Sequence, residues 1–166
     1  FGVYPDDEPV FHWMRGGAPA RQRCIEAEVM DLSDDIAYSV HDFEDAVVNR
    51  YVDPARLASR VGREGLLDAI QRWVGYDFVR DDLDAGLERL MAMPEWIPSF
   101  DGSRPALARL KNLTSDLIGR FARAATAATR EAFPADELTR YRAHVVVPAA
   151  VEVEMAVLKG IIGATV

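Results

Sequence analysis

The sequence predicts an all-α fold, an irregular helical bundle formed by a single region over residues 1–166. Two stretches, residues 20–49 and 104–131, repeat apolar side chains at steps of three or four, which is the spacing of one face of an α-helix. Proline and glycine divide the remaining sequence into shorter helix-sized segments. Because 49% of the 166 residues are hydrophobic, the chain can bury one core of ordinary size.

The first 18 residues are expected to form a docked irregular arm with about one helical turn. Prolines and a glycine pair interrupt them, and aromatic side chains lie between these breaks. The aromatic residues of the arm are Phe1, Tyr4, Phe11 and Trp13. The pair Gly16 and Gly17 lacks the lysine of a phosphate-binding loop, so we interpret it as a turn.

The first long helix is expected to begin near Pro19, since proline suits the first turn of a helix. Its apolar stripe consists of Ile25, Val29, Leu32, Ile36, Val40, Phe43 and Val47. Three short connecting helices should follow: one after Asp53 and Pro54, one over about residues 64–74 and one over about residues 81–93.

The second long helix is expected to open at Ser103, ahead of Pro105, and to pack against the first along its own stripe. That stripe consists of Ala106, Leu110, Leu113, Leu117, Phe121, Ala124 and Ala128. Near residues 141–148 a β-branched run ends at Pro148, which favours either a short strand or hairpin or an extended segment. A last helix should start at Ala149.

Composition excludes several classes of function. The net charge of −8 gives no attraction for nucleic acid or anionic lipid, so nucleic acid is an unlikely partner. With Cys24 as the only cysteine, an internal disulfide or a thiolate zinc site cannot form, which is typical of a cytoplasmic protein. No segment is long and apolar enough to span a membrane. Because the sequence starts at Phe1 without methionine and ends within an apolar run, we interpret it as a piece of a longer protein.

A polar face of the first long helix is the strongest candidate site. At about 100° per residue, Asp34, Tyr38 and Asp42 fall within an arc of roughly 80° on the side away from the apolar stripe. No lysine or arginine occurs between Asp31 and Asp45 to relieve the repulsion between carboxylates. Two interpretations stay open: a solvated acidic surface, or a surface that binds a divalent metal or a sugar hydroxyl.

Residues 29–46, VMDLSDDIAYSVHDFEDA, resemble the dGTPase-like deoxynucleoside triphosphate triphosphohydrolases of the HD superfamily. FGVYPDD at the start, LKNLT with the later Arg120, and EVEMAVLKGI near the end extend the resemblance over most of the chain. The resemblance implies that Asp34 is the last ligand of the metal site. It also implies that Tyr38 lies along the deoxyribose and that Asp42 accepts a hydrogen bond from the 3'-hydroxyl.

The resemblance further places Lys111 and Arg120 toward the triphosphate, although both also fit ordinary helix-surface cations. The dipeptide His41 and Asp42 is not the metal-binding pair of the superfamily, because Phe43 and Glu44 follow it where that pair is followed by a glycine and a histidine. We expect His12, His41 and His144 to have structural or surface roles. No residue of the chain is assigned as catalytic.

The resemblance implies that the intact enzyme hydrolyses a dNTP to deoxynucleoside and triphosphate. A bound divalent metal such as Mg²⁺ or Mn²⁺ would assist this reaction. The other ligands, two histidines and an aspartate, would lie upstream, so the chain alone is expected to be inactive and to bind no metal. The intact enzyme is expected to be a homo-oligomer. Two alternatives remain: a non-catalytic helical interaction or oligomerisation module, or an HD phosphohydrolase for another nucleotide.

Overall fold

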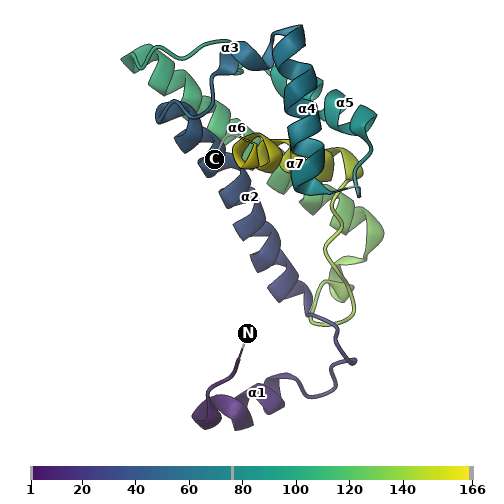
Figure 1. The fold of residues 1–166 in the computed structure, drawn as a ribbon. Helices are drawn as coiled ribbons and strands as arrows, with labels where there is room; N and C mark the ends of the chain where they lie inside the picture. Colours follow the sequence, from purple (N-terminus) through teal and green to yellow (C-terminus); the bar gives the residue numbers. More distant parts are fainter. Residues whose placement is uncertain (1, 76, 165–166) are drawn as a thin grey trace.

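The computed structural model describes residues 2–75 and 77–164, and within these ranges the regular structure is entirely helical. Figure 1 shows the long helices α2 and α6 beside a group of shorter helices. The helices are α1 (Glu8–Met14), α2 (Ile25–Val48), α3 (Pro54–Leu57), α4 (Arg60–Val74), α5 (Arg80–Met91), α6 (Arg104–Ala132) and α7 (Ala149–Gly163), with 3-10 turns η1 (Pro5–Asp7) and η2 (Ala135–Glu137). The predicted all-α fold is therefore confirmed.

Helix α6 begins where the sequence predicted, and α2 begins later. Ser103 caps α6, because its Oγ accepts a hydrogen bond from the Ala106 amide at 3.3 Å. The prediction that the first helix starts near Pro19 was wrong. Arg21 has φ 60°, a left-handed conformation that interrupts a helix, and Cys24 is extended. The amide of Ile25 instead donates to the Arg140 carbonyl at 2.8 Å, which anchors the start of α2.

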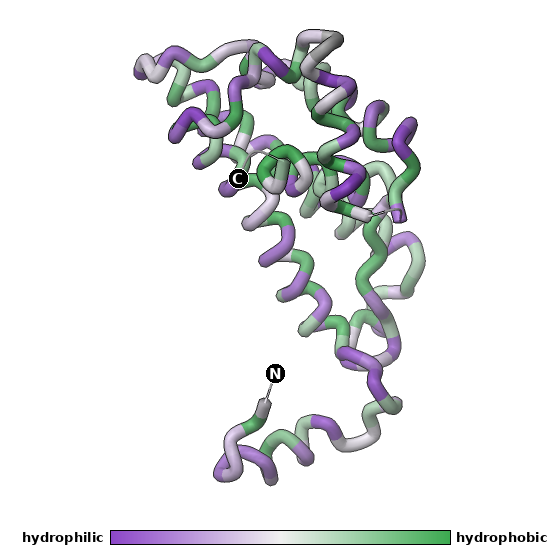
Figure 2. The backbone as a smooth tube through the Cα atoms, viewed as in Figure 1, coloured by the Kyte–Doolittle hydropathy of each residue, from purple (hydrophilic) through white to green (hydrophobic). Residues whose placement is uncertain are grey.

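Helix α7 is the centre of the bundle. Helices α2, α4 and α5 pack against it, most of its side chains are buried, and Figure 2 shows its largely hydrophobic course across the bundle. Two glycines permit the close approach of helices: a Cβ on Gly160 would lie 2.6 Å from Ile70 Cγ2, and one on Gly86 would lie 2.7 Å from Val153 Cγ1. The two long helices also pack together, as the sequence predicted, with α7 against one side of α2.

The strand or hairpin expected over residues 141–148 does not form, and residues 143–148 run without a strand partner in the described chain. Side chains of α2 and α6 instead accept hydrogen bonds from the backbone of this segment. The Val145 amide donates to Glu28 Oε2 at 2.7 Å, and the Val146 amide donates to Thr129 Oγ1 at 3.0 Å. The β-branched run is therefore held between α2 and α6 by side chains rather than by a sheet ladder.

The expectation of a docked N-terminal arm was also wrong. Phe1 lies outside the described residues, but Tyr4 is 79% exposed and Trp13 is 76% exposed. Residues 8–14 form α1, which projects away from the bundle in Figure 1. In the described parts of the chain, no helix combines the length and apolar character required to cross a membrane.

Candidate functional site

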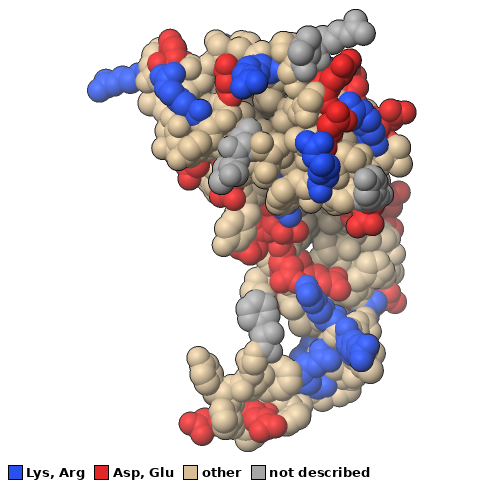
Figure 3. Space-filling view, viewed as in Figure 1, with Lys and Arg blue, Asp and Glu red and all other residues tan. Residues whose placement is uncertain are grey.

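Asp34, Tyr38 and Asp42, which we call the acidic ridge, are all exposed on α2. The opposite side of α2 buries Ile36 and Phe43 in the core. Tyr38 is 59% exposed although its ring is largely apolar. The structure therefore brings these three predicted residues onto one accessible helix face, and Figure 3 shows acidic side chains gathered over the middle of the molecule.

Two of the carboxylates beside the ridge pair with cations from other parts of the chain. Asp35 Oδ1 lies 3.0 Å from Lys159 Nζ on α7, and Asp31 pairs with Arg23. In contrast, the described chain provides no ion pair or hydrogen bond for the side chains of Asp34 and Asp42. The ion pairs of Asp31 and Asp35 thus relieve part of the repulsion between the carboxylates of α2. The carboxylates of Asp34 and Asp42 remain free to accept hydrogen bonds or to bind an ion.

Glu44 is a buried carboxylate on α2 that the sequence did not single out. Its Oε2 accepts a hydrogen bond from Thr114 Oγ1 on α6 at 2.7 Å, and its other oxygen pairs with Lys111. Burial alone would raise the pKa of Glu44, but the hydrogen bonds from Lys111 and Thr114 outweigh it and leave the pKa below its usual value. His41 Nδ1 lies 4.0 Å from the same carboxylate.

The two cations predicted to face the triphosphate lie in different surroundings. Lys111 is held by Glu44, and this hydrogen bond raises the pKa of Lys111. Arg120 Nη2 lies 2.7 Å from Oε1 of Glu154, a fully buried carboxylate on α7 that also accepts a hydrogen bond from Arg89. Lys111 is thus joined to α2, the helix of the acidic ridge, and Arg120 belongs to a cluster that joins α5, α6 and α7.

The histidines do not gather around Asp34 in a group that could hold a metal. His12 Nε2 lies 3.4 Å from Glu8 in the arm, and the ring of His144 packs edge-on against Phe133. In the described chain, no three His, Cys, Asp or Glu side chains are placed to bind one ion. Asp34 therefore does not belong to a group of three or more such side chains in the described part of the chain.

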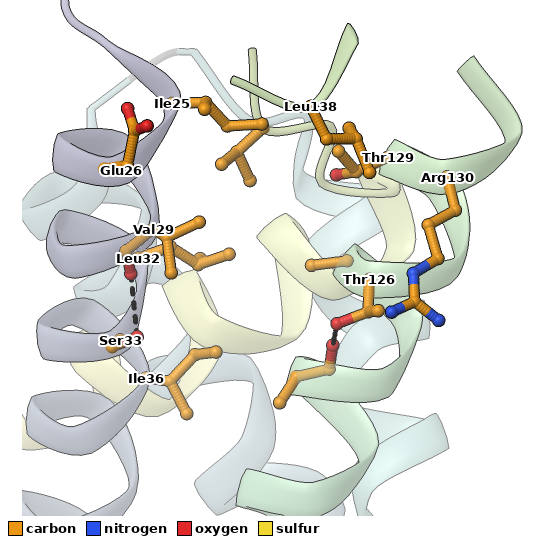
Figure 4. A pocket seen from close by; sticks show the side chains of 13 residues that line it. Ile25, Glu26, Val29, Leu32, Ser33, Ile36, Thr126, Thr129, Arg130 and Leu138 are labelled. Carbon is orange, nitrogen blue, oxygen red and sulfur yellow. Dashed lines mark hydrogen bonds between the residues drawn. The ribbon is translucent and has the colours of Figure 1, made fainter. Parts of the chain in front are cut away.

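A separate cleft of about 490 Å³ lies between α2 and α6. Figure 4 shows its walls, in which Val29, Leu32 and Ile36 of α2 face Thr126 and Thr129 of α6. Its hydroxyl groups bond within the chain, because Ser33 Oγ and Thr126 Oγ1 each donate to a carbonyl one turn earlier. None of the ridge residues lines this cleft, so it is not part of the candidate site.

Comparison with known proteins gives a consistent set of relatives, although no family model and no solved structure matches the chain. A deoxyguanosinetriphosphate triphosphohydrolase-like protein of Streptomyces coelicolor is 50% identical over 162 residues, which are 97% of this chain and 38% of the relative. Proteins with the same name are 45% identical in Bifidobacterium longum (97% of this chain, 34% of the relative) and 36% identical in Corynebacterium diphtheriae (97% and 38%). The chain thus spans little more than a third of these proteins. Over nearly its whole length, it is homologous to one part of the deoxyguanosinetriphosphate triphosphohydrolase-like proteins.

Proposed function

We propose that this chain is part of a metal-dependent HD-type enzyme that hydrolyses a deoxynucleoside triphosphate to deoxynucleoside and triphosphate. The observation that carries the proposal is that Asp34, Tyr38 and Asp42 share one exposed face of α2, where the side chains of Asp34 and Asp42 have no ion pair or hydrogen bond in the described chain. Asp31, Asp35 and Glu44 are paired with cations, and Asp45, which is also exposed and unpaired among the described residues, lies three residues beyond Asp42. The names of the relatives supply the substrate class.

The ridge fits a nucleotide because its residues occur once per helical turn. A step of four residues advances about 6 Å along a helix, so Asp34, Tyr38 and Asp42 can meet successive parts of one elongated ligand. Asp34 would hold the divalent ion together with ligands from the rest of the protein. The bound ion would supply an activated water and stabilise charge on the phosphate oxygens.

Tyr38 and Asp42 would bind the sugar. The exposed ring of Tyr38 offers a flat apolar surface for the deoxyribose, which lacks the 2'-hydroxyl. The carboxylate of Asp42 would accept a hydrogen bond, and the 3'-hydroxyl is a donor of the required kind. Binding this hydroxyl through an otherwise unpaired carboxylate would select against nucleotides that lack it.

Of the two candidate triphosphate ligands, Lys111 is the stronger. Its side chain is 69% exposed, and Glu44 fixes it to the helix that bears the ridge. Both cations pair with a buried carboxylate, but the Arg120 side chain is only 34% exposed and shares its partner Glu154 with Arg89. We also propose that the intact enzyme is a cytoplasmic homo-oligomer.

The test is replacement of Asp34 by alanine in the full-length protein. Hydrolysis of dGTP should fall by about a thousandfold or more, and its dependence on Mn²⁺ or Mg²⁺ concentration should weaken, because the ion loses a ligand. The fold should be unaffected because Asp34 is exposed and unpaired. Asp45→Ala, an exposed carboxylate of the same helix, is the matched control and should keep near-parental activity. Equal activities of the two variants would refute the proposed role.

A further inference from the structure

The N-terminal arm, residues 2–18, carries an unusual concentration of exposed apolar side chains. The large hydrophobic side chains of the described arm that are exposed are Val3, Tyr4, Val10, Phe11, Trp13 and Met14. Single exposed hydrophobic residues are normal on a protein surface, but a contiguous group on one short segment indicates a contact surface. The bundle already has a buried core without them, so the arm is not needed to complete it.

Polar contacts hold the arm at its C-terminal end. Arg140 Nη1 donates to the Met14 carbonyl at 2.7 Å, and Arg15 Nη1 donates to the Gln22 carbonyl at 2.8 Å. The Arg15 guanidinium also lies 5.5 Å from the centre of the Tyr141 ring. These contacts fix the direction of α1 while its apolar side chains stay in solvent, so the arm is presented outward rather than folded back.

The charge of the arm restricts what can cover it. Asp6, Asp7 and Glu8 occupy its first turns, and the ion pair recorded for them in the described chain is that of Glu8 with His12. Figure 3 shows acidic groups both on the arm and over α2, on either side of a hollow that separates the arm from the bundle. A complementary surface would therefore combine apolar side chains with lysine or arginine.

We infer that the arm is an internal docking surface, covered by the part of the full-length polypeptide that has no counterpart in these 166 residues. The length of the relatives is the reason for this choice of partner. This chain matches 38% of the Streptomyces protein and 34% of the Bifidobacterium protein, so the remaining 62% and 66% have no counterpart in it. A covalently linked segment meets the arm at a high effective concentration, which favours it over a second molecule. This inference does not depend on the chemistry proposed for Asp34.

Photo-crosslinking in the full-length protein tests this inference. The photoreactive residue p-benzoylphenylalanine would replace Trp13, and unlabelled and ¹⁵N-labelled protein would be unfolded, mixed in equal amounts and refolded together before irradiation, so that any oligomer contains both isotopes. The expected products join position 13 to residues outside these 166, always within one isotopic copy. Crosslinks between copies, for instance to the cleft between α2 and α6, would overturn the inference. Crosslinks from position 13 to the helical bundle of the same copy would also overturn the inference, and so would the absence of any crosslink.

A charge test adds a second readout with a matched control. The double substitution Asp6→Lys and Asp7→Lys should lower the yield of the intramolecular crosslink several-fold, since the covering surface is expected to be basic. Asp77→Lys changes an exposed carboxylate outside the arm and should leave the yield unchanged. An unchanged yield in the double variant would refute the basic character of the covering surface. Because crosslinking needs no substrate, its failure is distinguishable from failure of the proposed hydrolase activity.

Discussion

At the scale of single residues, the carboxylate side chains of α2 are chemically alike but differ in whether they have an ion-pair or hydrogen-bond partner. Glu44 is buried between Lys111 and Thr114, and Asp35 reaches Lys159 on α7. Asp34 and Asp42 remain unpaired in the described chain. Buried charges are tolerated where they are paired, while an unpaired exposed carboxylate is free to bind a ligand. Asp34 and Asp42, like the exposed Asp45, are therefore accessible to a ligand, whereas Glu44 is committed to contacts within the fold.

Asp42→Ala in the full-length protein should change substrate selection rather than metal use. The parental enzyme is expected to prefer dGTP over its 3'-deoxy analogue, because only the former pairs with the carboxylate. The variant should lose about tenfold to a hundredfold of this preference, the range of a lost hydrogen bond to a charged group. Steady-state kinetics with both nucleotides, beside a metal titration, measures it. A variant that keeps the parental ratio would contradict the role of Asp42.

Glu44→Gln should reduce stability in a pH-dependent way. The pKa of Glu44 is lower in the folded than in the unfolded protein. Its ionised carboxylate therefore contributes to the free energy of unfolding at pH values above the unfolded-state pKa, and this contribution is lost as pH falls through the folded-state pKa. The free energy of unfolding should drop by about 1–3 kcal/mol at pH 7, with the difference from the parent shrinking below about pH 4.5. Urea unfolding from pH 3 to 7 measures it, with the exposed Glu131→Gln as control. A difference that is constant with pH would contradict this account.

At the scale of elements, α7 organises the bundle through close packing. Its small residues let neighbouring helices approach, and its Glu154 accepts hydrogen bonds from Arg89 of α5 and Arg120 of α6. The second oxygen of Glu154 is buried and has no hydrogen-bond partner among the described residues. Packing therefore holds α5 against α7, and the ion cluster at Glu154 links both α5 and α6 to α7.

Two glycine substitutions should have opposite effects on stability. At Gly160 an added Cβ would lie 2.6 Å from Ile70 Cγ2, so Gly160→Ala should destabilise by about 1–3 kcal/mol through overpacking. At Gly65 in α4 no atom lies within 4 Å of the added Cβ, so Gly65→Ala should stabilise by up to about 1 kcal/mol through helix propensity. Thermal or urea unfolding of both variants measures the difference. Stabilisation by Gly160→Ala would show that α4 and α7 are less tightly packed than described.

At the scale of the whole molecule, the bundle presents an unpaired acidic ridge on α2 and an exposed apolar arm, and neither is completed by the described residues. The core lies among α2, α4, α5, α6 and α7. The ridge contributes one proposed metal ligand, and the arm contributes a surface without a covering element. Both features suit a chain that spans 34–38% of the length of its relatives.

The 166 residues alone should fold without acquiring hydrolase activity or a strong metal site. With a single carboxylate ligand, a dissociation constant near 1 mM would give only about 0.4 kcal/mol of stabilisation at 1 mM Mn²⁺. The melting temperature should therefore rise by less than about 2 °C. Differential scanning calorimetry with and without Mn²⁺, beside a dGTP hydrolysis assay, tests this. Hydrolysis of dGTP by the isolated chain would contradict the proposal that the remaining metal ligands lie in the rest of the full-length protein.

Local sequence pattern predicted the helical class, the two long helices, the connecting helices and the face that Asp34, Tyr38 and Asp42 share. These features follow from local periodicity and capping, which act over a few residues. The central place of α7, the exposure of the arm and the ion pairs of Glu44 and Asp35 became visible in the three-dimensional structure. It also replaced the expected strand by a segment bound to Glu28 and Thr129. These features depend on residues distant in sequence, whose approach is set by the packing of the whole core rather than by local pattern.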